Sequence, residues 1–176
     1  RPPRLTAADW LEAARALFSE SGIEAVQITA LSRRLGVTRG SFYWHFDGRE
    51  ALLTALVEEW RVRNTGVMIS ATADTATLDD GILALFSVWV DHGRFDMRLD
   101  QAVRDWARHD PALRRTVKTE DYARVRTITA LFERHGYART DAFIRARVIY
   151  FTQLSYYALD VEADEALTER LGYLEA

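Results

Sequence analysis

Apolar residues recur at intervals of three and four along most of the chain, and runs that alternate apolar and polar positions are scarce. A period near 3.6 residues is typical of amphipathic α-helices, so the pattern predicts an all-α fold. We expect about nine helices, at residues 6–21, 29–35, 38–45, 47–72, 78–92, 97–107, 110–133, 140–159 and 164–172.

The expected helix starts depend on side chains that can accept hydrogen bonds from unpaired backbone N–H groups. Thr6 and Asp9 have the spacing of a capping box, and Asp47 and Glu50 form a similar pair at the start of the fourth helix. Single caps are expected at Thr29, Asp110 and Thr140.

The second and third helices are short and are joined by a turn at Gly36, which makes them a candidate helix-turn-helix. Such a pair also occurs in ordinary helical bundles, so both DNA binding and plain packing stay open at this point. Residues 28–49 carry four arginines and one aspartate, a balance of +3, while the whole chain has a net charge of −3. A small basic segment on an acidic protein is typical of one phosphate-binding site, although surface charge is also uneven in proteins without such a site.

Five consecutive residues with rings, from Phe42 to Phe46, occupy the third helix. At 100° per residue Phe42 and Phe46 lie about 40° apart, which predicts that both face the core of the small domain. Tyr43 and Trp44 then project from the opposite side. Gly40 is unfavourable inside a helix and has two interpretations: a DNA backbone approaches closely there, or a neighbouring helix does.

Several classes of protein are disfavoured by what the sequence lacks. With no cysteine there are no disulfides or thiolate metal sites, and no apolar run reaches the roughly 20 residues that span a bilayer. The four histidines are scattered, and no nucleophile elbow or phosphate-binding glycine loop is present. We therefore expect a cytoplasmic protein that is not an enzyme and binds no cofactor or metal. A helical enzyme and a helical interaction module without DNA binding remain the competing hypotheses.

The stretch ITALSRRLGVTRGSFYWHFDGREALL, residues 28–53, resembles the helix-turn-helix signature of the TetR family of one-component transcriptional regulators. The preceding FSESGIEAVQITAL, residues 18–31, is similar to the lead-in of that family. The resemblance covers about residues 5–60. It implies a DNA-binding domain at residues 1–48 and an effector-binding and dimerisation domain at residues 49–176. The implied function is a ligand-responsive regulator, a repressor by preference with activation left open, that binds a palindromic operator.

Carried over position by position, the resemblance implies that the third helix enters the major groove with its N-terminal edge towards the bases. Arg39 is the candidate for reading guanine, because its fork matches two acceptors of that base. Arg33 is interpreted as solvated, and Arg34 as either solvated or bound to phosphate. The implied DNA-binding residues are Thr29, Thr38, Arg39, Gly40, Ser41, Tyr43, Trp44, His45 and Arg49.

The resemblance also implies an effector pocket in the larger domain and a homodimer formed through about residues 140–172. Aromatic residues are dense there, which suits either an ordinary core or a pocket for a small, largely apolar effector. Helix 140–159 is apolar on more than one side, which suits an isologous interface or a fully internal helix. The candidate ligand-binding residues are Phe86, Trp89, His92, Trp106, Tyr122, Arg126, Tyr150 and Gln153.

Overall fold

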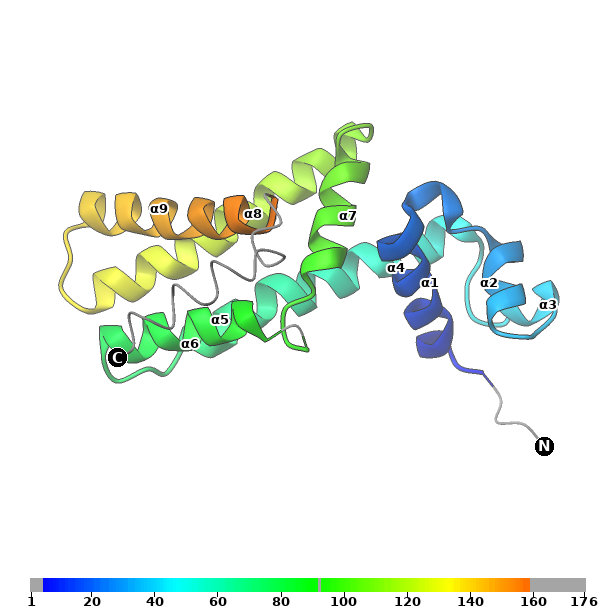
Figure 1. Ribbon diagram of the computed structural model, residues 1–176, viewed down its shortest axis with the longest axis horizontal. Coiled ribbons are helices and arrows are strands. Elements are labelled where there is room, and N and C mark those ends of the chain that lie inside the picture. Colours follow the sequence, from blue (N-terminus) through cyan, green and yellow to red (C-terminus); the bar gives the residue numbers. More distant parts are fainter. Residues whose placement is uncertain (1–4, 92, 159–176) are drawn as a thin grey trace, which may run out of the picture. The chain divides into compact units, whose positions relative to one another are not determined.

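The computed structural model describes residues 5–91 and 93–158, and every regular element in these ranges is a helix (Figure 1). The elements are α1 (Ala7–Ser21), the 3₁₀ turn η1 (Ile23–Ala25), α2 (Ile28–Arg34), α3 (Arg39–Phe42), α4 (Arg49–Trp60), the π-helical η2 (Arg61–Gly66), α5 (Val67–Thr72), α6 (Leu78–Val90), α7 (Met97–Ala107), α8 (Pro111–Arg134) and α9 (Arg139–Ala158). The all-α prediction is confirmed. The predicted helix 47–72 is the continuous run α4–η2–α5, and the predicted helix 164–172 lies outside the described residues.

Two of the predicted helix caps are confirmed. The Thr6 hydroxyl accepts a hydrogen bond from Asp9 N at 3.3 Å, and the Asp9 carboxylate accepts one from Thr6 N at 2.6 Å, which completes a capping box. Asp110 Oδ1 accepts from the backbone amides of Ala112 and Leu113, with Pro111 as the first residue of α8.

The other predicted caps are wrong by one or two residues. The Gln27 carbonyl already accepts a hydrogen bond from Leu31 N at 3.0 Å, so Thr29 lies inside α2 instead of capping it. Gly48 is the residue before α4, and no side chain caps that helix, so Asp47 and Glu50 form no capping box. Thr140 lies in the first turn of α9, which begins at Arg139.

The chain divides into two compact units, each built from two stretches of sequence. The first comprises residues 1–67 and 89–120, and the second residues 68–88 and 121–176. The expected functional division at residue 48 is a different kind of boundary and stays a prediction.

The core of the first unit joins α1, α2, α3, α4 and α7 in one apolar cluster. Trp10, Phe18 and Phe42 are almost fully buried there, together with Leu56 and Trp60 of α4. Leu99, Val103 and Ala107 of α7 belong to the same cluster, so a segment far along the chain completes the core around the N-terminal helices.

The carboxylate of Asp100 is buried beside this apolar core. Its two oxygens accept hydrogen bonds from Trp60 Nε1 at 2.8 Å, Arg104 Nε at 2.7 Å and Asn64 Nδ2 at 3.3 Å. A buried charge is tolerated only where hydrogen bonds and an opposite charge replace the lost water, and Asp100 has both.

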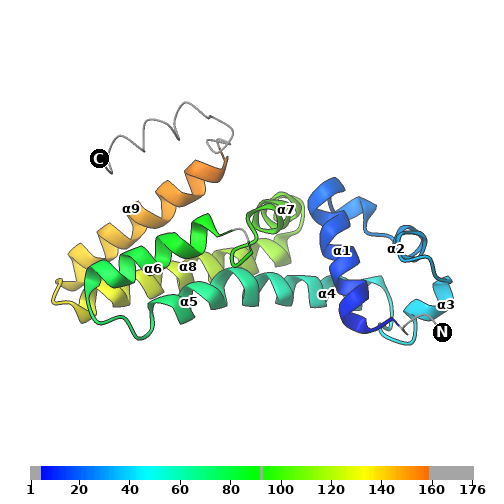
Figure 2. The ribbon, with the colours of Figure 1, turned by 60° about the horizontal axis from the view of Figure 1, so that its bottom comes forward.

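In the second unit α6 and α8 run alongside each other, as Figure 2 shows, and approach closely at Gly81. A Cβ at Gly81 would lie 2.4 Å from Leu131 Cδ1, so a larger residue would push the two helices apart. Tyr150 of α9 donates its hydroxyl hydrogen to Asp121 of α8 at 2.5 Å. Arg134, the last residue of α8, donates hydrogen bonds to the carbonyls of Thr72 and Ala73 and so connects α8 to the end of α5.

Within the described ranges, no helix is long and apolar enough to cross a membrane. In the same ranges, no three histidine, aspartate or glutamate side chains form a group that could hold a metal ion.

Asp100→Ala should lower the free energy of unfolding by about 3–5 kcal/mol, because three donors lose their acceptor inside the core. Asp100→Asn should cost less, since an amide oxygen still accepts. Chemical denaturation followed by tryptophan fluorescence measures both variants. Asp105→Ala is the matched control on the exposed side of α7 and should change stability by no more than about 0.5 kcal/mol. An equally small loss for Asp100→Ala would contradict the importance of this network.

Candidate DNA-binding surface

The turn between α2 and α3 is formed by backbone hydrogen bonds and one glycine. Val37 N donates to the carbonyl of Ser32 at 2.9 Å, and Gly36 N donates to that of Arg33 at 3.2 Å. Gly36 has a φ of 68°, in the left-handed region where a side chain would be strained. The sharp reversal predicted at this position is therefore present, and it brings α3 across the end of α2.

The inner side of α3 is fixed by Phe42, which has no exposed surface. Its ring meets Trp10 edge-on with centroids 5.2 Å apart and stacks on the half-buried Phe46 at 5.6 Å. The α-helical part of this segment is only four residues long, shorter than the predicted 38–45, and residues 43–45 continue it as a turn. A helix of one turn is unstable by itself, so these ring contacts set its position.

The outer side carries most of the residues that the family resemblance assigned to DNA. Tyr43 and Trp44 have 54% and 78% of their surface exposed, and Thr38, Arg39 and Gly40 are also exposed. Ser41 and His45 are half-buried. The sequence-based division of the aromatic run into an inner and an outer side is confirmed for Phe42, Tyr43 and Trp44. The contacts of all these residues with DNA stay predictions.

Gly40 is not explained by packing within the described part of the chain. A Cβ built there would meet only Thr38 Oγ1, at 3.8 Å. The interpretation that a neighbouring helix needs the glycine therefore loses its support, and the close approach of an external surface remains as a hypothesis.

The arginines of the basic segment have different environments. Arg39 is exposed, and none of the described residues holds its guanidinium by a hydrogen bond or an ion pair. Arg34 makes a two-pronged ion pair with Glu20 of α1, at 2.7 and 2.8 Å. These hydrogen bonds lower the pKa of Glu20 below its ordinary value of 4.5. Arg33 is exposed, as its interpretation as a solvated residue requires.

The Arg49 side chain donates hydrogen bonds to two backbone carbonyls, which could not be predicted from the sequence around it. Its Nε donates to the carbonyl of Val26 at 2.7 Å, and its Nη2 donates to that of Ile23 at 2.8 Å. The start of α4 is thereby bonded to the segment that leads into α2. The phosphate contact predicted for Arg49 stays a prediction, and Nη1, 3.6 Å from Glu50, is the nitrogen not engaged by these carbonyls.

The predicted ligand-binding residues within the described ranges are divided between the two units. Trp106 packs edge-on against Phe18 in the core of the first unit, and the buried Trp89 also belongs to that unit. The exposed Tyr122 and Arg126 share an open groove of about 1000 Å³ in the second unit, lined also by Ile69, Arg139 and Phe143. His92 lies outside the described residues.

The remaining three candidates also lie in the second unit. Phe86 on α6 is half exposed, whereas Tyr150 and Gln153 lie on the buried side of α9. Both polar atoms of the Gln153 amide are buried and have no hydrogen-bond partner among the described residues. Buried amides are normally satisfied, so we expect a partner for this side chain beyond the described residues.

These observations define a helix-turn-helix protein whose third helix has an apolar inner side and an exposed outer edge. Comparison with known proteins agrees with that class. Residues 11–56 match the family described as "Bacterial regulatory proteins, tetR family". Similar proteins include the transposon Tn10 TetC protein of Escherichia coli, 38% identical over 80 residues. That alignment takes in 45% of this chain and 38% of TetC.

A second relative is the class A tetracycline repressor of transposon 1721 from Escherichia coli, 39% identical over 54 residues. The match spans 31% of this chain and 25% of the repressor. The chain thus aligns with well under half the length of these curated relatives.

Solved structures share the fold over most of the chain. A TetR transcriptional regulator from Legionella pneumophila superposes with a TM-score of 0.74 at 16% identity, covering 99% of this chain and 97% of its own. Reduced NemR of Escherichia coli gives a TM-score of 0.72 at 17% identity, with coverages of 97% and 96%. Residues 11–56 thus match the TetR family of regulators, and the chain shares the fold of solved TetR-family structures.

Phe42→Ala should lower the free energy of unfolding by about 3–5 kcal/mol, because it leaves a cavity between Trp10 and Phe46. Tyr43→Phe changes an exposed hydroxyl and should leave stability within about 0.5 kcal/mol of the wild type. Denaturant titration monitored by circular dichroism measures both. Equal losses for the two variants would contradict the division into inner and outer sides.

Glu20→Gln should reduce thermal stability near pH 7, and its difference from the wild type should shrink as the pH falls. The folded-state pKa of Glu20 lies below 4.5, so the carboxylate stabilises the fold above pH 4.5 and loses this effect as acid protonates it. Melting temperatures between about pH 7 and pH 3 test this. Glu24→Gln is the control, since Glu24 is exposed and takes part in no ion pair found in the described ranges. A pH-independent difference for Glu20→Gln would refute the prediction.

Proposed function

We propose that this protein is a ligand-responsive transcriptional repressor that binds a palindromic DNA operator as a homodimer and is released by a small, largely apolar effector. The observation that carries the proposal is the exposed N-terminal edge of α3. There Arg39 has no intramolecular partner among the described residues, on a helix whose other side is anchored by Phe42. An unpaired guanidinium on a fixed helix is suited to reading base edges.

DNA contacts divide into those that position the protein and those that read sequence. We assign sequence reading to Arg39 and its neighbours Thr38, Gly40 and Ser41. Tyr43, His45 and Arg49 are assigned to phosphates, Trp44 to the DNA backbone or a thymine methyl, and Thr29 to a phosphate near the start of α2. A repressor of this kind acts where the DNA is, so we place it in the cytoplasm of a bacterium.

A dimer through about residues 140–172 is supported by the two apolar sides of α9. Ala142, Ala146 and Tyr150 are buried on one side, whereas Ile144 and Val148 are 54% and 61% exposed on another. Phe151, one turn further along, is also partly exposed, at 44%. Apolar side chains at intervals of four and three residues form a stripe that a second copy of the same helix can cover.

An effector site in the second unit is supported by two features. The open groove at Tyr122 and Arg126 offers an aromatic ring and a cation. The buried Gln153 amide offers a donor and an acceptor that pair with nothing else in the described part of the chain. Phe86 and Tyr150 complete the proposed ligand-binding residues of this unit. Trp89, His92 and Trp106 are retained only as predictions from sequence. An effector acts as an inducer to the extent that it prefers the conformation that does not bind DNA.

Arg39→Ala should weaken binding to the preferred duplex by about 1–3 kcal/mol and relax its sequence preference, because base contacts are lost. The duplex is first obtained by in vitro selection with the wild-type protein, and affinities are then measured by fluorescence anisotropy at several salt concentrations. Arg108→Ala, at an exposed ion pair of α7, is the control and should bind as the wild type does. If the wild type binds the selected and a random duplex equally at physiological salt, the proposed function is wrong.

Val148→Glu should raise the dissociation constant of the dimer by at least about tenfold, because two like charges would face each other across a twofold interface. Sedimentation velocity over a range of concentrations measures the change. Thr119→Glu adds the same charge at an exposed position of α8 and should leave the dimer intact. A Val148→Glu protein that dimerises as tightly as the wild type would remove α9 from the interface.

A further inference from the structure

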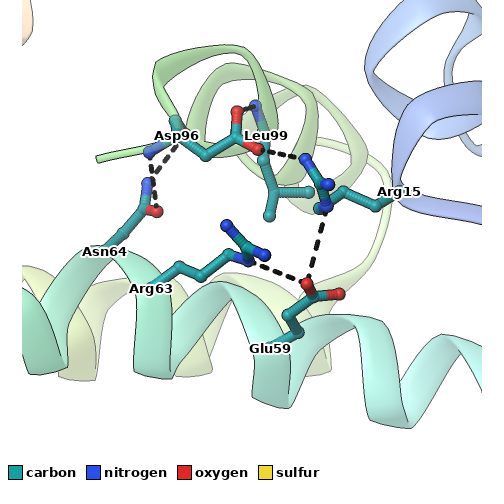
Figure 3. Close-up of polar contacts among 6 residues, drawn as sticks. All are labelled: Arg15, Glu59, Arg63, Asn64, Asp96 and Leu99. Carbon is teal, nitrogen blue, oxygen red and sulfur yellow. Dashed lines mark hydrogen bonds and ion pairs between the residues drawn. The ribbon is translucent and has the colours of Figure 1, made fainter. Parts of the chain in front are cut away.

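A single carboxylate in the first unit serves two helices at once (Figure 3). Asp96 is the N-cap of α7, where its Oδ1 accepts a hydrogen bond from Leu99 N at 3.0 Å. Its other oxygen, Oδ2, accepts one from Nη1 of Arg15 in α1 at 2.9 Å. The cap of α7 and the attachment of α1 therefore share the same side chain.

The backbone of Asp96 is fixed by a third element, the π-helical η2. Asn64 Nδ2 donates to the Asp96 carbonyl at 2.9 Å, and Asp96 N donates to Asn64 Oδ1 at 3.3 Å. Asn64 is fully buried and also donates to Asp100. Asn64 thus links η2 to Asp96 and Asp100, and π segments often occur at functional sites.

Arg15 is held from a second direction by Glu59 of α4. Its Nε lies 3.5 Å from Glu59 Oε1, the oxygen that also accepts from Arg63 Nε at 2.8 Å. The side chains of Arg15, Asp96 and Glu59 are 23%, 17% and 18% exposed. Because these groups are largely withdrawn from water, their attraction is screened less than that of a surface ion pair.

The position of α1 determines the position of α3, the helix proposed to read DNA (the recognition helix). Trp10, five residues before Arg15 on the same helix, holds Phe42 of α3. The apolar contacts between α1 and α7, such as the edge-on pair of Phe18 and Trp106, constrain orientation less tightly than a charge-assisted hydrogen bond does. The Arg15 guanidinium makes a charge-assisted hydrogen bond to the cap residue of α7 and an ion pair with Glu59 of α4, and the hydrogen bond has a preferred direction.

We infer that Arg15 is a positioning residue for DNA recognition, which orients α1 and the attached α3 relative to α4 and α7. This inference rests on the proposed function, because a dimer on a palindrome needs both recognition helices at a fixed spacing and angle. Arg15 itself touches no base in this assignment. Its loss should harm binding to a specific site, where both helices must fit together, and spare the loose binding of random DNA.

Arg15→Met removes the hydrogen bond to Asp96 and the ion pair with Glu59, and keeps an unbranched apolar side chain. We expect its dissociation constant for the selected duplex to rise on the order of tenfold, and that for a random duplex to stay within about twofold. Arg108→Met is the control, with the same change of charge at an exposed ion pair on α7. Full-length proteins are compared at a temperature at which circular dichroism shows every variant to be folded.

Two further variants keep the test decisive if Arg15→Met folds poorly. Asp96→Asn retains a good N-cap acceptor for Leu99 N but loses the charge that holds Arg15, so it should reproduce the loss of specific binding. Arg15→Lys should retain part of the specific binding that Arg15→Met loses, since a lysine keeps the positive charge but lacks the forked guanidinium. The double variant Arg15→Met/Asp96→Asn should be no worse than Arg15→Met alone, because both changes break one interaction.

The results separate this inference from the function on which it depends. A lower melting temperature with unchanged affinity for the selected duplex would show that Arg15 is structural only. Equal losses for the selected and random duplexes would show a lost phosphate contact instead of a positioning effect. A wild-type protein that enriches no duplex overturns the proposed function, and the inference with it.

Discussion

The contact between Phe42 and Trp10 is the constraint on which the DNA-binding part of this protein depends. A helix of four residues has no stability of its own, so α3 exists only where another element holds it. The edge-on packing of these two rings transfers the position of α1 to α3. Whatever orients α1 therefore also orients the residues proposed to read DNA.

Polar contacts supply the direction that apolar packing does not. Arg49 bonds the start of α4 to two carbonyls near η1, and Arg34 bonds α2 to α1 through Glu20. Each bond alone is modest, and the exposed pair between Arg34 and Glu20 is further weakened by solvent. Their value lies in geometry, because each joins two elements that the apolar core would allow to shift.

The helices, the turn at Gly36 and the division of the aromatic run could be predicted from sequence because they depend on local periodicity and backbone conformation. The exact caps at Thr29, Asp47 and Thr140 could not, since several neighbouring residues can begin a helix and tertiary contacts choose between them. Arg15 and Asp96 are 81 residues apart, and no spacing rule connects them. The predicted effector residues share aromatic composition, a property that core and pocket have in common, so composition could not tell Trp106 in a core from Tyr122 at a groove.

The first unit is assembled from two separate stretches of the chain, residues 1–67 and 89–120. Leu99, Val103 and Ala107 of α7 belong to the same cluster as Trp10 and Trp60, and Asp100 accepts from the Trp60 indole. Cutting the chain after α4 would therefore remove part of the core on which the N-terminal helices pack. For protein engineering, the N-terminal helices therefore cannot be transferred to another protein by themselves. A chimera must also include α7 or replace the apolar surface with which α7 covers them.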